Sequence, residues 1–181
     1  LVFFPSYDYL QSAAQAFENR FPQFPLLVQQ RKMTDEERQN FLSTFKDGGE
    51  VCGFAVMGGA FSEGVDLKGN RLIGAVVVGV GLPQIGIERD LIRNHFSGTG
   101  FEYAYQYPGL VRVLQTAGRV IRDEEDRGII FLVDRRYRER RYLDLLPSEW
   151  APRACENTAE VAVNLESFWS RQQSLFGVSG P

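Results

Sequence analysis

Residues 72–80 read LIGAVVVGV, and this segment decides the fold class of the chain. Its apolar residues stand on consecutive positions, which is typical of a strand that is buried on both faces of a parallel sheet. Residues 1–4 (LVFF) and 128–133 (GIIFLV) have the same character. Segments with helical spacing separate these runs. The sequence therefore predicts an α/β protein with a mostly parallel sheet flanked by helices.

The remaining elements follow from spacing and capping residues. Ser6 is a good N-cap for a helix that ends near Arg20, and residues 34–37 form a capping box for a second helix. We expect strands at residues 1–4, 26–28, 51–57, 72–80 and 128–133, and helices at residues 6–20, 34–48, 87–96, 109–122, 134–146 and 158–172. The pattern predicts one α/β unit at residues 1–147 and a C-terminal helical tail at 148–181.

Composition excludes several classes of function. The chain has 181 residues and a net charge of −3, so a nucleic-acid surface could only be a local patch. One histidine, His95, and two cysteines, Cys52 and Cys155, are too few for a histidine-rich metal site or a disulfide framework. No apolar run approaches the ~18 residues of a membrane span. We expect a cytoplasmic protein without a membrane partner. Because the chain opens inside an apolar strand without a leader, we also expect a piece of a larger protein.

A glycine-rich loop, residues 58–70, follows the strand at 51–57. Loops at the carboxyl ends of parallel strands are where open α/β sheets bind ligands. Gly58, Gly59 and Gly64 permit close backbone approach to phosphate, and Glu63 and Asp66 provide acceptors for a ribose hydroxyl or a water. The alternative is a surface turn with two solvated carboxylates.

A second candidate site is the segment QTAGRVIR, residues 115–122. On a helix, Gln115, Arg119 and Arg122 lie on one face, and Gly118 leaves room for a close neighbour. Two arginines on one helix face can bind phosphate oxygens, as arginine fingers do. The alternative is an exposed amphipathic helix whose arginines pair with the acidic residues at 123–126.

These segments resemble a known family. Residues 115–122 look like motif VI of superfamily 2 helicases, residues 62–66 (SEGVD) resemble motif V in its DinG/XPD-like form, and residues 2–7 (VFFPSY) resemble motif IV. The order IV, V, VI and the separations fit the second motor domain of that family. The resemblance implies that residues 1–147 form a RecA-like domain, related to P-loop NTPases but without its own phosphate loop. It also implies a DNA helicase driven by ATP that moves 5′ to 3′ on single strands.

The resemblance assigns roles to individual residues. Arg119 and Arg122 would act as the catalytic arginines at ATP, Arg122 being the γ-phosphate contact. The expected ATP-binding residues are Gln115, Glu63, Gly64 and Asp66, and the expected DNA-binding residues are Ser6, Tyr7 and Ser62. From the residues alone, Ser6 could equally be a simple helix cap.

The chain lacks several parts of a complete motor. It contains no phosphate loop, no acidic strand end for magnesium and no four-cysteine set for an iron–sulfur cluster. The resemblance implies that ATP and Mg²⁺ bind jointly with an N-terminal motor domain of the same parent chain, that a cluster is possible only in the parent, and that this fragment alone is inactive. Two alternatives stay open: a non-catalytic module that binds nucleic acid or protein, and a stand-alone nucleotide-binding enzyme.

An arginine-rich run, DRRYRERRY at residues 134–142, is the third polar feature. Its interleaved tyrosines are found in some proteins that bind single strands. The alternative is a solvated helix face on which Glu139 and Asp144 balance the arginines.

Overall fold

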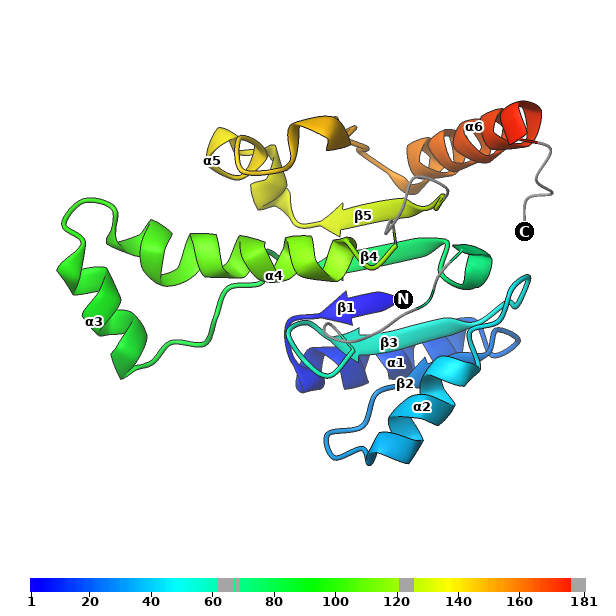
Figure 1. The fold of residues 1–181 in the computed structure, drawn as a ribbon, viewed down its shortest axis with the longest axis horizontal. Coiled ribbons are helices and arrows are strands. Elements are labelled where there is room, and N and C mark those ends of the chain that lie inside the picture. The colour runs from blue at the N-terminus through cyan, green and yellow to red at the C-terminus, as the bar shows by residue number, and fades with distance from the viewer. Residues whose placement is uncertain (62–66, 68, 121–125, 177–181) are drawn as a thin grey trace. The chain divides into compact units, whose positions relative to one another are not determined.

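The computed structural model describes residues 1–61, 67, 69–120 and 126–176, and they form two compact units, Leu1–Leu145 and Leu146–Pro181 (Figure 1). The strands are β1 (Val2–Phe4), β2 (Leu26–Val28), β3 (Cys52–Val56), β4 (Gly74–Val78) and β5 (Ile129–Val133). The helices are α1 (Tyr7–Arg20), α2 (Asp35–Ser43), α3 (Ile87–His95), α4 (Tyr107–Ala117), α5 (Arg140–Leu143) and α6 (Thr158–Phe176). Shorter turns are 3-10 helical at Gly69–Arg71, Arg135–Arg138 and Ser148–Trp150, and π-helical at Glu102–Gln106.

The sheet of the first unit is parallel throughout and has the strand order β2-β3-β1-β4-β5. In Figure 1 the arrows of β1, β3 and β5 point the same way. Phe3, in the central strand, pairs with Ala55 on one side and Val77 on the other, and all three are fully buried. The predicted α/β class with a parallel sheet is confirmed. All five strands therefore end at the same edge.

Helices cover both faces of the sheet. On one face, Leu10 and Ala14 of α1 pack with Phe4 and Phe54 in a single apolar cluster. On the other face Gly53 of β3 lies against Phe41 of α2 and Phe45 just after it, since an added Cβ would lie 3.2 and 2.6 Å from their rings. Helix α4 contacts β4, and Figure 1 shows it in front of the sheet whereas α1 passes behind β3. This double cover is why the strands are apolar on consecutive positions.

Two helix starts agree with their predicted caps. The Ser6 hydroxyl accepts a hydrogen bond from the Tyr9 backbone N–H and caps α1. At α2 the Thr34 hydroxyl accepts from the Glu37 backbone N–H, and the Glu37 carboxylate accepts from the Thr34 N–H at 2.7 Å. Both are local sequence signals, so they need no tertiary information.

The predicted helix at 109–122 is shifted in the structure. Helix α4 starts at Tyr107, because Pro108 falls in the first turn, where a missing N–H costs nothing. It ends at Ala117, because Gly118 forms the C-cap and donates its N–H to the Leu114 carbonyl. The π-helical turn that precedes α4 was not expected from the sequence.

The predicted single helix at 134–146 is wrong. Asp134 caps a 3-10 turn, Glu139 takes an extended backbone conformation (φ −82°, ψ 134°), and only the four residues of α5 follow as α-helix. Tyr137 and Tyr142 explain the break, since both rings are buried and contact each other edge to face at 6.4 Å. Those tyrosines are therefore not available as stacking surfaces for bases.

The second unit contains α6, for which Asn157 and Glu160 provide a capping arrangement. The Glu160 N–H donates to the Asn157 side chain, and the Glu160 carboxylate accepts from the Glu156 N–H. None of the helices in the described ranges is long and apolar enough to cross a membrane.

Candidate nucleotide and nucleic-acid site

The carboxyl edge of the sheet gathers the polar segments that the sequence singled out. Ser6 and Tyr7 follow β1, Gln29 follows β2, and the glycine-rich loop that begins at Gly58 follows β3. The arginine-rich run follows β5. These segments share an edge because all the strands run in one direction, and such an edge is the usual ligand site of open parallel sheets.

Tyr7 is held in place by a buried amide. The Gln29 Nε2 donates to the Tyr7 hydroxyl at 2.9 Å, and the Gln29 Oε1 accepts from the Val56 backbone N–H at 2.8 Å. The guanidinium of Arg31 lies 4.9 Å from the centre of the Tyr7 ring and pairs with Asp8 at 2.7 Å. Gln29 thus connects the turn after β1 to the end of β3.

Gln29 is a site residue that no motif in the sequence pointed to. It is only 4% exposed, although glutamine is usually a surface residue. A glutamine directly after an apolar strand was a detectable signal, because buried amides are normally hydrogen-bonded. Its two partners were not predictable without the strand order.

Helix α4 presents Gln115 toward the entrance of the glycine-rich loop. A surface cleft of about 560 Å³ is lined by Gly58 at the end of β3 and by Arg112 and Gln115 of α4. Gly58 has a φ of +74°, and an added Cβ there would lie 3.5 Å from Arg112 Cδ. The structure therefore brings Gln115 and the start of the loop together.

Arg119 is not on the helical stripe that the sequence predicts. It follows the C-cap Gly118 in a turn, where its N–H donates to the Thr116 carbonyl, so it does not extend the Gln115 face of α4. Its side chain is half-buried. Among the other predicted site residues, Arg122, Ser62, Glu63, Gly64 and Asp66 lie outside the described residues.

The described residues that flank those segments are in contact. The Gly69 N–H donates to the Asp126 Oδ1 at 3.0 Å, and Asp126 is buried. Phe61, just before the motif V-like segment, and Val120, within the motif VI-like segment, are also buried. The hydrogen bond therefore joins the described residues that follow the two segments.

The start of α4 is fixed to the sheet by two glycines. Gly81 has a φ of +66°, and an added Cβ on Gly109 would lie 2.6 Å from the Val80 carbonyl oxygen. Backbone therefore touches backbone where α4 crosses the end of β4, which sets the position of Gln115 relative to the sheet edge.

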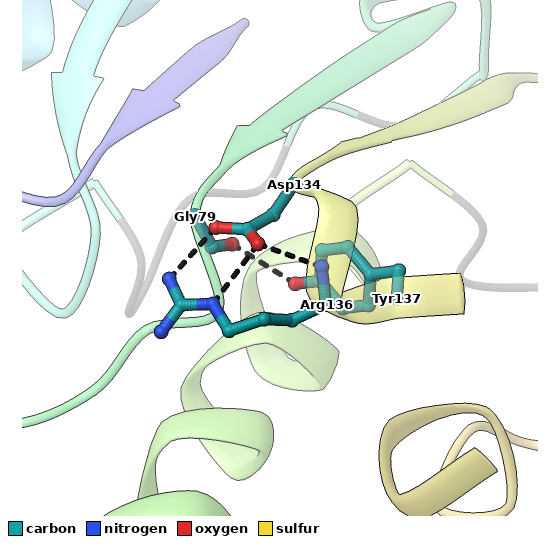
Figure 2. Close-up of polar contacts among 4 residues, drawn as sticks. All are labelled: Gly79, Asp134, Arg136 and Tyr137. Carbon is teal, nitrogen blue, oxygen red and sulfur yellow. Dashed lines mark hydrogen bonds and ion pairs between the residues drawn. The ribbon is translucent and has the colours of Figure 1, made fainter. Parts of the chain in front are cut away.

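The arginine-rich run begins with a closed polar cluster (Figure 2). The Arg136 guanidinium donates to both Asp134 oxygens, at 2.9 and 2.7 Å, and the Tyr137 hydroxyl donates to the Gly79 carbonyl at 2.9 Å. The hydrogen bonds and charge of Arg136 lower the pKa of Asp134, and Asp134 raises the pKa of Arg136. Burial raises the pKa of Tyr137. Arg136 is thus engaged with Asp134 and does not present a free charge.

The described residues contain no group of three or more histidine, cysteine, aspartate or glutamate side chains that could hold a metal ion. The chemistry that they do offer, guanidinium and amide donors beside a glycine, fits phosphate oxygens. The donor set is thus compatible with the phosphates of a nucleotide.

The chain is similar to helicases in its sequence and its fold. Residues 1–153 match the family described as the helicase C-terminal domain. The chain is 29% identical over 172 residues to an "ATP-dependent DNA helicase chl1" of Aspergillus niger, an alignment covering 76% of this chain and 20% of that protein. It is also 29% identical over 171 residues to the "Regulator of telomere elongation helicase 1 homolog" of Drosophila grimshawi, covering 83% and 17%. The chain spans about a fifth of the length of these relatives.

Solved structures with the same fold include one described as "XPD_APO", with a TM-score of 0.64 and 22% identity over 79% of this chain and 29% of that chain. Another is "Mss116p DEAD-box helicase domain 2 bound to an RNA duplex", with a TM-score of 0.50 and 15% identity, covering 98% of this chain and 66% of that one. At these identities the likeness shows the fold alone. The chain therefore belongs to the helicase C-terminal domain family, and its parallel sheet has the fold of a RecA-like helicase domain 2.

Proposed function

We propose that this chain is the C-terminal motor half of an ATP-dependent DNA helicase. ATP and Mg²⁺ bind at the interface with an N-terminal motor domain of the same parent chain, which supplies the phosphate loop and the magnesium ligands. When bound, ATP supplies the phosphoryl group whose transfer to water drives movement along the strand. This chain supplies the two arginines and the polar groups of the interface: Arg119, Arg122, Gln115, Glu63, Gly64 and Asp66.

The observation that carries the proposal is the meeting of the two motif-bearing segments. Gln115, of the motif VI-like segment, lines the same cleft as Gly58, where the loop that carries the motif V-like segment begins. Two segments far apart in the chain thus meet at one cleft, which supports a shared ligand. Relatives named as ATP-dependent DNA helicases support ATP as that ligand.

Single-stranded DNA is the proposed partner of the turn after β1. Ser6 and Tyr7 stand at the N-terminus of α1, where backbone N–H groups attract phosphate. Gln29 and Arg31 fix the Tyr7 ring and hydroxyl, so the turn is preorganised for such a contact. Ser62 is the third proposed DNA contact. We further propose that the protein acts in the cytoplasm.

The direct test is Arg122→Lys in the full-length parent protein. Lysine keeps the charge but loses the planar fork that can clasp two phosphate oxygens. Because an arginine finger is worth about 10³–10⁵ in rate, DNA-stimulated ATP hydrolysis should fall at least about 100-fold. Arg20→Lys, at the exposed end of α1, is the matched control, and thermal melting checks folding. Normal turnover in a folded Arg122→Lys protein would remove Arg122 from the nucleotide site.

A second candidate function is a module that only binds another protein. Ile85, Ile87 and Leu91, at and before α3, are 85%, 81% and 65% exposed, and such an apolar surface is typical of a partner site. This candidate would be favoured if the parent hydrolysed no ATP while Ile87→Asp released a co-purifying protein.

A further inference from the structure

The cleft beside Gly58 is lined by charged and aromatic side chains in addition to Gln115, and the proposed role of Gln115 at phosphate does not explain their presence. Its wall combines two arginines, Arg89 of α3 and Arg112 of α4, with two tyrosines, Tyr103 and Tyr107. No aspartate or glutamate of the described ranges lines it. The lining is thus cationic and aromatic, and it holds no carboxylate to neutralise the arginines.

The arginine charges at this cleft are not matched within the described chain. Arg112 is half-buried, and its guanidinium makes no hydrogen bond or ion pair with any described residue. Arg89 donates only a long hydrogen bond, 3.4 Å, to the Ala104 carbonyl. Holding a guanidinium partly out of water without a counter-charge costs free energy, which a bound anion would offset.

The tyrosines form an exposed aromatic ladder next to these charges. Phe96 and Tyr103 stack at 4.3 Å, and Tyr103 meets Tyr107 edge to face at 5.3 Å. Tyr103 is 46% exposed and Tyr107 is 38% exposed, so aromatic surface remains uncovered. Aromatic side chains next to arginines are a common platform for nucleobases, because every base presents a π face.

We propose that this cleft binds one nucleotide unit, with the base against the Tyr103–Tyr107 ladder and the phosphate between Arg112 and Arg89. The unit is either the nucleoside triphosphate or one residue of a single strand, since both offer an aromatic base and a phosphate. The proposal rests on the proposed function in expecting these ligands and in sharing the cleft with Gln115, but the four residues that would hold the ligand lie outside the helicase motifs. Arg112 and Tyr103 are therefore further binding residues.

Fluorescence anisotropy with the 181-residue chain at low salt tests the proposal. One probe is N-methylanthraniloyl-ATP and the other is a fluorescein-labelled dT₁₂ strand. Arg112→Gln and Tyr103→Leu should each weaken binding of the same probe at least about fivefold, since stacking on one aromatic residue accounts for about that factor or more. Tyr103→Phe, which keeps the ring, and Arg20→Gln, an exposed control at the end of α1, should bind within twofold of the unchanged chain.

The probe that responds identifies the source of the nucleotide. Three results would overturn the proposal: neither probe binds, neither cleft variant weakens either probe beyond twofold, or Arg20→Gln weakens binding as much as Arg112→Gln does. These binding results do not depend on whether the proposed function holds, because that function is tested separately by the rate of ATP hydrolysis of the full-length Arg122→Lys protein. Circular dichroism verifies that each variant is folded.

Discussion

Replacing Gln29 by leucine should destabilise the first unit by about 1–3 kcal/mol. The amide makes two hydrogen bonds, to the Tyr7 hydroxyl at 2.9 Å and from the Val56 N–H at 2.8 Å. Each is worth about 0.5–1.5 kcal/mol net, and a leucine of similar size leaves both partners facing an apolar group. The side chain of the neighbouring Gln30 is exposed and donates to the Val28 carbonyl, and the Gln30 backbone carbonyl that accepts from Tyr7 is kept in Gln30→Leu. Gln30→Leu is therefore the matched control and should change stability by less than about 0.5 kcal/mol.

Urea denaturation of the chain, followed by circular dichroism, measures this effect. A double-mutant cycle with Tyr7→Phe isolates the hydrogen bond between the two side chains, for which we expect a coupling free energy of about 1 kcal/mol. Full additivity of Gln29→Leu and Tyr7→Phe would refute the connection between the two turns. A loss for Gln29→Leu no larger than that of Gln30→Leu would refute the structural role of the buried amide.

Three further predictions concern the positions that fix the sheet edge. Gly109→Ala should lower the free energy of unfolding by about 1–3 kcal/mol, because its Cβ would lie 2.6 Å from a backbone oxygen. Gly74→Ala is the control, because its Cβ would meet only an ordinary contact, and it should be neutral or stabilising in the same urea titration. Tyr137→Phe should cost about 1 kcal/mol through loss of its bond to the Gly79 carbonyl, and an unchanged melting temperature would contradict this. Because the pKa of Asp134 is lowered in the folded chain, its stabilisation is present above the ordinary carboxyl pKa of about 4 and is lost as the pH falls below it. The stability advantage over Asp134→Asn should therefore shrink between pH 6 and about pH 3, and a constant difference would contradict the ion pair.

The strands and the helix caps were predictable because their signals are local. The apolar side chains of a run such as residues 72–80 are buried only if both faces of the strand are covered. The capping box at Thr34 is defined by four consecutive residues. The family resemblance, based on three ordered segments, is confirmed by the match over residues 1–153.

The errors arose where tertiary contacts override local preference. Gly118 was interpreted as an interior glycine but acts as the end of α4, which moves Arg119 off the helical face. The arginines and glutamate of 134–146 favour a helix, yet the burial of Tyr137 and the cap formed by Asp134 divide that segment. Gln29 was missed for a related reason, since its partners come from β1 and β3 and are neighbours only in the finished sheet.

The central position of β1 also has a consequence for biosynthesis. Val2 of β1 pairs with Phe54 of β3 on one side and with Val76 of β4 on the other. Both partner strands are translated later, so the backbone N–H and C=O groups of β1 have no strand partner when β1 leaves the ribosome. Its buried phenylalanines, Phe3 and Phe4, stay accessible to chaperones, and to other nascent chains, until β4 has been translated. Synthesis that pauses before β4 should therefore increase aggregation, whereas a pause after β5 should have little effect.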